Sequence, residues 1–399
     1  MKSYIFAFIL WLASSLSYSI NTNKITNSFQ QAVELAIQGG MDAQYDLAVL
    51  FYNGGTNNLN VNKAVKWYKL AAQQGHAQAQ LHLGSMYFIG KGVEKDSTMA
   101  LHWYRLAAQQ GSDVAQNNLG NMYYNGDGVK TDITMATKWY QLAAQQGHMV
   151  AQFNLGSLYA KGDTGKIDTT LAMKWLELSA QQGHYKAQFN LALLYTQGQG
   201  VKANTETAIK WLQLSAKQGY AQAQFNLGVM YRRGEGIKAD PIKALKLYRS
   251  SAEQGYMKAQ YNLGVMYDNG QGVKVDSETA IKWYTLAAEQ GQVNAQYNLG
   301  LIFEKGEDVR ADSKRAISWY SLAAEQGFKA AQYNLGVMYA NGTGVKRDYI
   351  KAYAWLNVAA IAGLDEAIIS INKLTNMLTE KERIKAKSLS KEFSQKIKN

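Results

Sequence analysis

Histidine, serine and carboxylate side chains could carry catalytic or metal chemistry in this chain, but their types and spacing indicate neither. The chain has only five histidines, and three of them, His76, His148 and His184, occupy the same position of a repeating pattern. Equivalent side chains of stacked helix pairs are separated by at least one interhelical distance of about 8–10 Å, which is too long for a shared metal ion. The chain contains no cysteine and no HExxH or GxSxG motif. We therefore expect no enzyme activity, no metal site and no cofactor.

A repeat of 36 residues positions all of these side chains, and Ala259–Asn294 is a representative copy. Nine copies follow one another without insertion, and each opens with an Ala-Gln pair. The copies begin at Ala43, Ala79, Ala115, Ala151, Ala187, Ala223, Ala259, Ala295 and Ala331. A fixed period in this range is typical of a solenoid of two-helix units. The sequence therefore predicts an all-α protein.

Each copy predicts two helices. In the representative copy, Leu263 and Met266 recur at helical spacing, and Gly270 follows where a left-handed residue would end the first helix. Asp276 is expected to cap the second helix, because its carboxylate accepts hydrogen bonds from the free amides of a helix start. The other copies also have Asp or Asn here, and the only proline, Pro241, follows one of them at the first helical position.

Two further positions of the repeat indicate how the copies stack. We call the equivalent residues of all copies at one position a column. Seven copies have a glycine inside the first helix, such as Gly264, with Ala48 and Ala192 as the exceptions. Because glycine in a helix interior costs about 1 kcal/mol relative to alanine, we expect another helix backbone to approach closely there. A tryptophan column from Trp67 to Trp355 is expected to fill the gaps between neighbouring copies.

The pattern AQxxLGxMYxxGxGVxxDxxxAxxWYxLAAxQG resembles the Sel1-like repeat, a relative of the tetratricopeptide repeat, over residues 42 to 366. The resemblance implies a right-handed α/α superhelical solenoid that binds other proteins. Departures are confined to loops, at residues 54–58, at residues 162–165 and at Asp308, which replaces a glycine. The lack of cysteine also departs from the cysteine-rich bacterial members, so functions peculiar to those members are not expected here.

Segments outside the repeats complete the expected domain organisation. It comprises a signal peptide at 1–19, an N-terminal capping segment at 20–42, nine repeats at 43–366 and C-terminal capping helices at 367–399. Residues 1–19 combine a basic start, a short apolar run and a small-residue end, which is typical of a cleaved secretory signal. A membrane anchor is the alternative, although the run is short for a span. We expect an exported chain, periplasmic or secreted, with no stable membrane span.

The capping segments are expected to be helical only in part. Residues 29–38 resemble the second half of a repeat, whereas residues 20–28 are polar and are expected to be loose. A tenth first helix is expected from Ala367, and Thr379 with Glu382 form a capping box before a final helix. The lysine-rich final helix is either a solvated cap surface or a basic docking tail.

The formal net charge is +12, and much of the excess lies in columns. Lys274 belongs to a loop column and Lys282 to a second-helix column, so stacked copies are expected to carry basic stripes. Such stripes favour acidic partners or an anionic envelope surface, although solubility and helix-start chemistry account for them equally well. Nucleic acid is not an expected partner of an exported chain.

A concave groove formed by the first helices is the expected binding surface. In tetratricopeptide geometry the second residue after each Ala points into it, and most copies have an aromatic residue there, followed by asparagine. The ninth and tenth residues after each Ala are expected to form the lip of the groove. They vary between copies, from Arg232-Arg233 to Asp268-Asn269 and Glu304-Lys305. The candidate partner-binding residues are Phe153, Phe189, Phe225, Tyr261, Tyr297, Asn190, Asn226, Asn262, Arg232 and Arg233. The alternative is that the aromatic and asparagine columns only pack between repeats.

Two classes of function fit these features. The first is a non-enzymatic scaffold that binds a partner protein or peptide through the groove, at the envelope or at a host surface if the source is bacterial. The second is a binder or regulator of peptidoglycan, the cell-wall glycan, or of cell-wall enzymes, through its tyrosine, tryptophan and basic columns.

Overall fold

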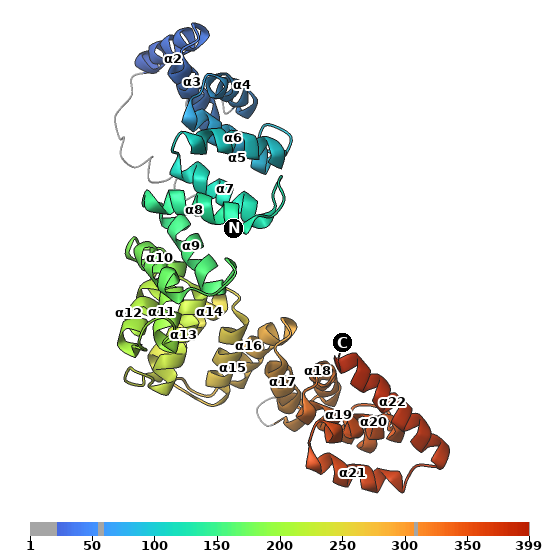
Figure 1. The fold of residues 1–399 in the computed structure, drawn as a ribbon. Helices are drawn as coiled ribbons and strands as arrows, with labels where there is room; N and C mark the ends of the chain where they lie inside the picture. Colours follow the sequence, from blue (N-terminus) through green and yellow to red (C-terminus); the bar gives the residue numbers. More distant parts are fainter. Residues whose placement is uncertain (1–21, 55–59, 307–309, 399) are drawn as a thin grey trace. The chain divides into compact units, whose positions relative to one another are not determined.

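The computed structural model describes residues 22–54, 60–306 and 310–398, and every regular element in these ranges is a helix. The expected signal peptide, the loop residues 55–58 and Asp308 lie outside the described residues. The chain forms two compact units, Met1–His184 and Tyr185–Asn399. Within each unit, each helix packs against the next one along the chain, except that the last two helices of the chain both pack against the helix before them (Figure 1). The predicted all-α solenoid of two-helix repeats is confirmed.

The first unit contains an N-terminal helix and four repeats, and in each repeat the odd-numbered helix comes first. Its helices are α2 (Thr22–Ile37), α3 (Met41–Asn53), α4 (Val61–Gln73), α5 (Ala77–Ile89), α6 (Ser97–Gln109), α7 (Asp113–Asn125), α8 (Ile133–Gln145), α9 (Met149–Lys161) and α10 (Thr169–Gln181).

The second unit contains five repeats and two C-terminal helices. Its helices are α11 (Tyr185–Gln197), α12 (Thr205–Lys217), α13 (Ala221–Arg233), α14 (Pro241–Glu253), α15 (Met257–Asp268), α16 (Ser277–Glu289), α17 (Val293–Lys305), α18 (Ser313–Glu325), α19 (Lys329–Asn341), α20 (Tyr349–Ile361), α21 (Asp365–Thr375) and α22 (Glu380–Lys398).

Glycine and Asp or Asn set the helix boundaries as predicted. Gly234 ends α13 with φ 73°, in the left-handed region that favours glycine. The carboxylate of Asp240 then accepts the backbone N–H of Lys243, and Pro241 opens α14. The residues that cap the nine second helices in this way are Asn60, Asp96, Asp132, Asp168, Asn204, Asp240, Asp276, Asp312 and Asp348.

Tyrosines, rather than tryptophans, fill the interior of the stacks. Tyr68 in the first unit and Tyr248, Tyr284 and Tyr320 in the second unit are among the largest fully buried side chains. The tryptophan column directly precedes the tyrosine column, and most tryptophans, such as Trp211, are only partly buried. All described tryptophans of this column nevertheless belong to a hydrophobic cluster or pack against one, and Trp103 lies in a cluster with residues of the preceding repeat, which agrees with the expected packing role. Adjacent residues of a helix point in directions about 100° apart around its axis. When the tyrosine faces the neighbouring helix, the tryptophan before it therefore lies at the edge of that interface.

The glycines inside the first helices make room for the tyrosine rings. A Cβ atom on Gly264 would lie 2.6 Å from Cδ1 of Tyr284, which is closer than real contacts allow. In two repeats whose second helix carries leucine instead, a Cβ on Gly156 or Gly336 would also lie 3.2 or 3.1 Å from a carbonyl oxygen of that helix. Close backbone approach therefore occurs in the leucine repeats, whereas a side chain makes the close contact in the tyrosine repeats.

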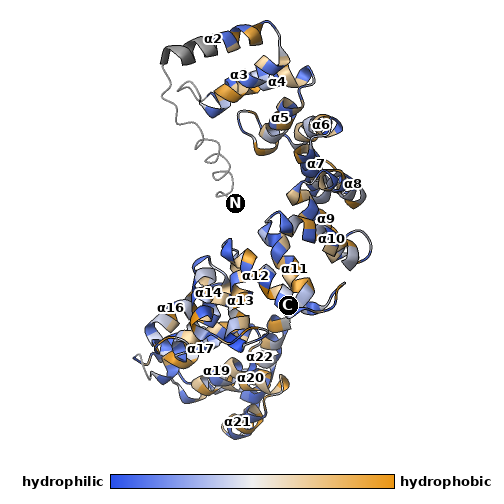
Figure 2. Cartoon of the chain, turned by 90° about the vertical axis from the view of Figure 1, so that its left-hand side faces the viewer, coloured by the Kyte–Doolittle hydropathy of each residue, from blue (hydrophilic) through white to orange (hydrophobic). Residues whose placement is uncertain are grey.

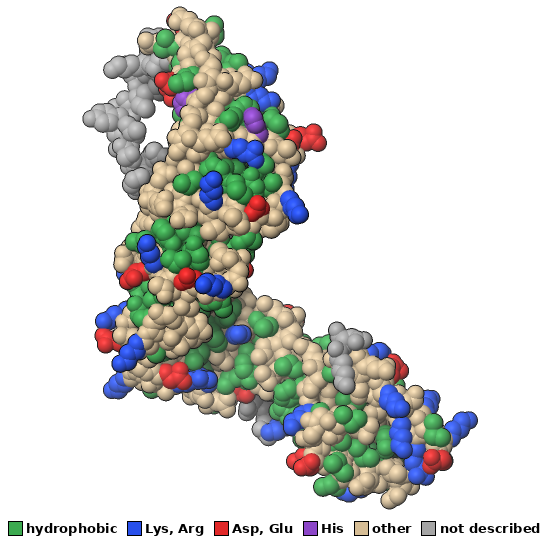
Figure 3. Space-filling model, in the orientation of Figure 1, with side chains coloured by type: hydrophobic (Ala, Val, Ile, Leu, Met, Phe, Trp, Pro, Cys, Tyr) green, Lys and Arg blue, Asp and Glu red, His purple; other side chains and the backbone are tan. Residues whose placement is uncertain are grey.

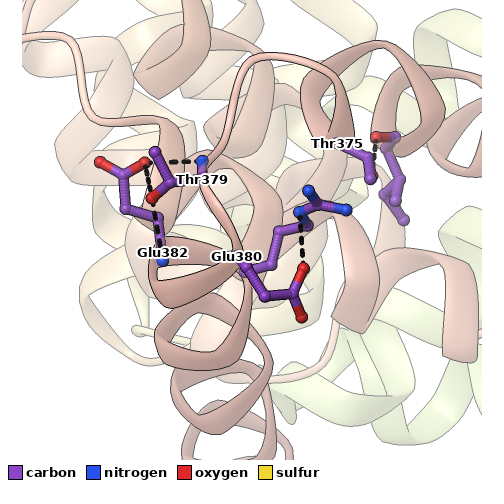
Figure 4. A network of polar contacts seen from close by, with 6 residues as sticks. Thr375, Thr379, Glu380 and Glu382 are labelled. Atoms are coloured by element: carbon purple, nitrogen blue, oxygen red, sulfur yellow. Dashed lines mark hydrogen bonds and ion pairs between the residues drawn. The ribbon is translucent and has the colours of Figure 1, made fainter.

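Extra helices close both ends of the chain. Helix α2 begins at Thr22, so the expectation of a loose segment at 20–28 is wrong from residue 22 onward. Polar residues can extend a helix once packing fixes its other half, and Ala36 of α2 is only 1% exposed. At the far end, the predicted capping box opens α22. The carboxylate of Glu382 accepts the Thr379 hydroxyl at 2.7 Å and the Thr379 backbone N–H at 2.9 Å (Figure 4).

Second helices such as α4 and α12 bury residues on one side only, and Figure 2 shows both hydrophobic and hydrophilic residues along the helices of each unit. This pattern is typical of helices that bury one face against a neighbour. Among the described helices, none combines the length and the apolar character that a membrane crossing requires.

Candidate interaction face on the first helices

The predicted site residues lie on the first helices of five consecutive repeats. Phe153 belongs to α9 of the first unit, and the other nine residues belong to α11, α13, α15 and α17 of the second unit. We refer to these nine as the first-helix face: Phe189, Asn190, Phe225, Asn226, Arg232, Arg233, Tyr261, Asn262 and Tyr297.

The aromatic rings of the face pack against aromatic rings of their own repeats. Phe225 packs against Tyr248 of its own repeat, with ring centroids 5.7 Å apart, and against Tyr256 at 5.3 Å. Tyr297 makes the two equivalent contacts in its own repeat. Both rings are partly exposed, whereas Phe189 is only 8% exposed and belongs to the core. These rings therefore contribute to packing within each repeat, and most of them also retain some exposed surface.

Asparagine side chains of the first helices lie beside phenol groups of the preceding repeat. The Asn262 amide is beside the hydroxyl of Tyr248, and the Asn298 amide lies within reach of both Tyr284 and Tyr261. These contacts join successive repeats. A carboxamide has two donors and two acceptor lone pairs, so one phenol leaves further positions for a bound chain.

Buried tyrosines orient two carboxylates on the lip of the face. The hydroxyl of Tyr284 donates to Oδ2 of Asp268 at 3.1 Å, and the hydroxyl of Tyr320 donates to Oε2 of Glu304 at 2.6 Å. Burial, reinforced by the neighbouring carboxylate, raises the pKa of both phenols well above the ordinary tyrosine value. The two phenols therefore stay protonated and continue to donate to the carboxylates.

In the repeat before these two, the lip position equivalent to Asp268 and Glu304 is occupied by the cation Arg232. The Nε atom of Arg232 and the hydroxyl of Tyr248 are both buried without a hydrogen bond of good geometry among the described residues, although the two groups are neighbours. Burial raises the pKa of Tyr248, and the Arg232 charge opposes this rise. Arg233 is more exposed and pairs with Glu235, with 3.2 Å between Nη1 and Oε1.

The corresponding tyrosines of the first unit use uncharged partners. Tyr104 donates to Oγ of Ser85 at 3.0 Å, and Tyr140 donates to Oδ1 of Asn121 at 2.7 Å. The charged lip is therefore a property of three repeats in the second unit. The sequence marked these lip positions as the most variable ones, but their pairing with buried phenols 16 residues further on could not be anticipated from a helical pattern.

Comparison with known proteins agrees with this architecture. The family model described as the Sel1 repeat matches nine segments, at 42–76, 77–112, 113–148, 150–184, 186–220, 221–256, 258–292, 293–328 and 329–364. No curated protein matches the chain.

Two solved structures support the same assignment. The chain is similar to c5321, a protective antigen present in uropathogenic Escherichia coli strains that displays an SLR fold, with 32% identity and a TM-score of 0.56. That match covers 92% of this chain and 95% of the antigen. It is also similar to a Sel1 repeat protein from Oxalobacter formigenes, with 35% identity, a TM-score of 0.60, and coverage of 77% of this chain and 90% of that protein. The chain belongs to the Sel1 repeat family.

Proposed function

We propose that this protein is a non-enzymatic scaffold that binds a protein or peptide partner through the groove of its first helices. Sel1 repeat proteins generally mediate protein–protein interactions, and the family is typically non-catalytic. The proposed contacts are the first-helix face of the second unit and, in the first unit, Phe153. Partly exposed aromatic rings suit this role, because rigid rings bury a large area and are enriched among residues that dominate binding energy.

The charge sequence at one lip position carries the proposal. Arg232, Asp268 and Glu304 occupy equivalent positions in three consecutive repeats, so the sign changes from positive to negative along the face. Stacking does not require these charges, because serine and asparagine satisfy the equivalent hydroxyls in the first unit. Opposite charges across an interface fix orientation and partner choice. The partner segment is therefore expected to be extended, with an acidic group over Arg232 and basic groups over Asp268 and Glu304.

Export is part of the same proposal. A cleaved signal peptide at residues 1–19 would place the chain in the periplasm or outside the cell. There it would meet an envelope protein or, if the source is bacterial, a host protein. The similarity to an E. coli protein named as a protective antigen supports a location where exported proteins are found.

A second candidate is binding of peptidoglycan or of cell-wall enzymes. It is supported by the partly exposed tryptophans of the second helices, since Trp283 has the Lys282 ammonium over its ring at 5.7 Å from the centroid. An aromatic ring beside a cation would suit an anionic glycan. Sedimentation with purified peptidoglycan separates the two candidates, because a groove-binding scaffold is not expected to sediment with it.

Charge variants provide the test of the favoured function. A partner captured from envelope extract is titrated against the wild-type chain, the double variant Asp268→Asn/Glu304→Gln and Arg232→Gln. We expect slower association for each variant, with a weaker dependence on salt. The matched control is Glu278→Gln/Glu289→Gln on α16, which removes two carboxylates outside the face. Equal effects of the two double variants would contradict the proposal.

A further inference from the structure

A ladder of glutamine side chains connects the helices of each repeat to the repeat before it. Gln296 of α17 donates from Nε2 to the carbonyl oxygen of Ala288 at 3.0 Å, and its Oε1 accepts Nε2 of Gln326 at 2.7 Å. Gln326 follows the last residue of the second helix of the same repeat. The eight acceptor–donor pairs of this kind are Gln44–Gln74, Gln80–Gln110, Gln116–Gln146, Gln152–Gln182, Gln188–Gln218, Gln224–Gln254, Gln260–Gln290 and Gln296–Gln326.

The ninth repeat has the acceptor of this pair but not the donor. Gln332 donates to the carbonyl oxygen of Ala324 at 3.1 Å, as the pattern requires. The position that supplies the donor elsewhere is occupied by Ala362. Oε1 of Gln332 has no hydrogen-bond partner among the described residues, although the residue is only 1% exposed. Buried polar atoms in proteins almost always have a partner, so this acceptor calls for a donor from elsewhere.

A pocket lies beside Gln332. Gln332 and Ala362 both line it, together with residues of α20 and α22, and its volume is about 700 Å³. The volume is within the range of about 300–1,000 Å³ that small-ligand sites occupy. Val358 of α20 contributes apolar lining, and Lys387 and Lys391 of α22 also line the pocket. Figure 3 shows Lys and Arg side chains gathered over α22.

We propose that this pocket binds a glutamine-like ligand: a primary carboxamide on a short aliphatic stem that ends in a carboxylate. The carboxamide would donate to Oε1 of Gln332, as the Gln326 side chain does to Gln296. The stem would lie on the apolar lining, and the carboxylate would pair with Lys387 and Lys391. The C-terminal glutamine of a peptide and a free N-acylated glutamine share this chemistry. The site is separate from the first-helix face and does not depend on the function proposed above.

Calorimetric titration of the full chain with four probes tests the ligand chemistry. The probes are N-acetyl-L-glutamine, N-acetyl-L-glutamate, N-acetyl-L-glutaminamide and the peptide acetyl-Ala-Ala-Gln. We expect N-acetyl-L-glutamine to bind at least about tenfold more tightly than the glutamate analogue, since a site built to meet an N–H group rejects an analogue that lacks it. The glutaminamide is expected to bind more weakly, because it has no carboxylate. Tighter binding of the peptide would identify a chain terminus as the source, and tighter binding of N-acetyl-L-glutamine would identify a free compound.

The variant Ala362→Gln decides whether the unpaired acceptor is the cause of binding. The new side chain restores the pair found in the other eight repeats, so we expect a higher melting temperature and at least about a tenfold loss of N-acetyl-L-glutamine affinity. Gln332→Met removes the acceptor at similar volume and is expected to lose affinity as well. Ile369→Gln adds the same group on α21 outside the pocket and should bind as the wild type does. Undiminished binding by Ala362→Gln, equal affinity for the glutamate analogue, or no binding at millimolar concentration would each overturn the proposal.

Discussion

The ring of Tyr284 occupies the space that a β-carbon on Gly264 would need, with 2.6 Å between that atom and Cδ1 of the ring. Glycine is therefore favoured in the middle of α15 because a side chain of α16 fills the position above it, although the first repeat combines Ala48 with the buried Tyr68. The same relationship recurs at Gly84 with Tyr104 and at Gly228 with Tyr248.

A double-mutant cycle on this pair should show strong coupling. We expect Gly264→Ala to destabilise the wild-type chain by up to about 1–3 kcal/mol through overpacking. In the Tyr284→Leu background the same change should be neutral or stabilising, since alanine is the better helix former by about 1 kcal/mol. The fifth repeat already combines Ala192 with Leu212. Chemical denaturation measures the four free energies of unfolding, and an unchanged effect of Gly264→Ala in both backgrounds would show that the ring is not the obstacle.

The repeat, the helix boundaries and the capping residues could be predicted from the sequence because they depend on local chemistry. A left-handed glycine such as Gly234 and a cap such as Asp240 act on residues within one turn of themselves. The identity of the buried aromatic column could not be predicted in this way. Tryptophan and tyrosine are adjacent in most copies, and the rotation of the second helix, which depends on its neighbours, decides which ring faces the core.

For the candidate site, the sequence predicts which positions of the repeat belong to it but not which residues at those positions are exposed. Phe189 and Phe225 occupy equivalent positions, but one is in the core and the other is partly exposed. This difference in exposure depends on the neighbouring side chains, which differ from one repeat to the next and cannot be read from the 36-residue period. Likewise, the hydrogen bond between Tyr284 and Asp268 joins two helices across a loop, and no periodicity of either helix implies it.

Removing a ladder donor inside the stack should destabilise the chain. Gln326→Ala recreates in the eighth repeat the arrangement found at Ala362 and leaves the buried Oε1 of Gln296 without a partner. An unpaired buried acceptor costs about 1–3 kcal/mol. Urea denaturation of this variant measures the loss. The comparison is Glu325→Ala, which removes an exposed side chain from the preceding position, and equal stability of the two variants would argue against a role for the ladder.

The stacks should lose stability at high pH because their buried tyrosines resist ionisation. Burial raises the pKa of Tyr248, Tyr284 and Tyr320 in the folded chain. Their contribution is fully present below the ordinary tyrosine pKa of about 10. It is lost as the pH rises above that value, because the unfolded chain then releases protons that the folded chain retains.

Melting temperatures measured between about pH 8 and pH 11 test this dependence. The wild-type chain should lose stability steeply above about pH 10. Tyr284→Phe/Tyr320→Phe should show a shallower decline, since two of the responsible groups are absent. A slope identical to that of the wild type would mean that the decline has another origin, such as lysine deprotonation.

Binding by the first-helix face is the central claim, and removal of its rings tests it most directly. The double variant Tyr261→Ala/Tyr297→Ala is compared with Leu286→Ala/Leu322→Ala, which removes exposed apolar side chains from the second helices α16 and α18. The measurement is the Kd for the captured partner, together with the melting temperature of each variant. We expect the tyrosine variant to lose binding by about 2 kcal/mol or more per ring, and the leucine variant to bind as the wild type does. Wild-type affinity in the tyrosine variant, or an equal loss in the leucine variant, would contradict the account.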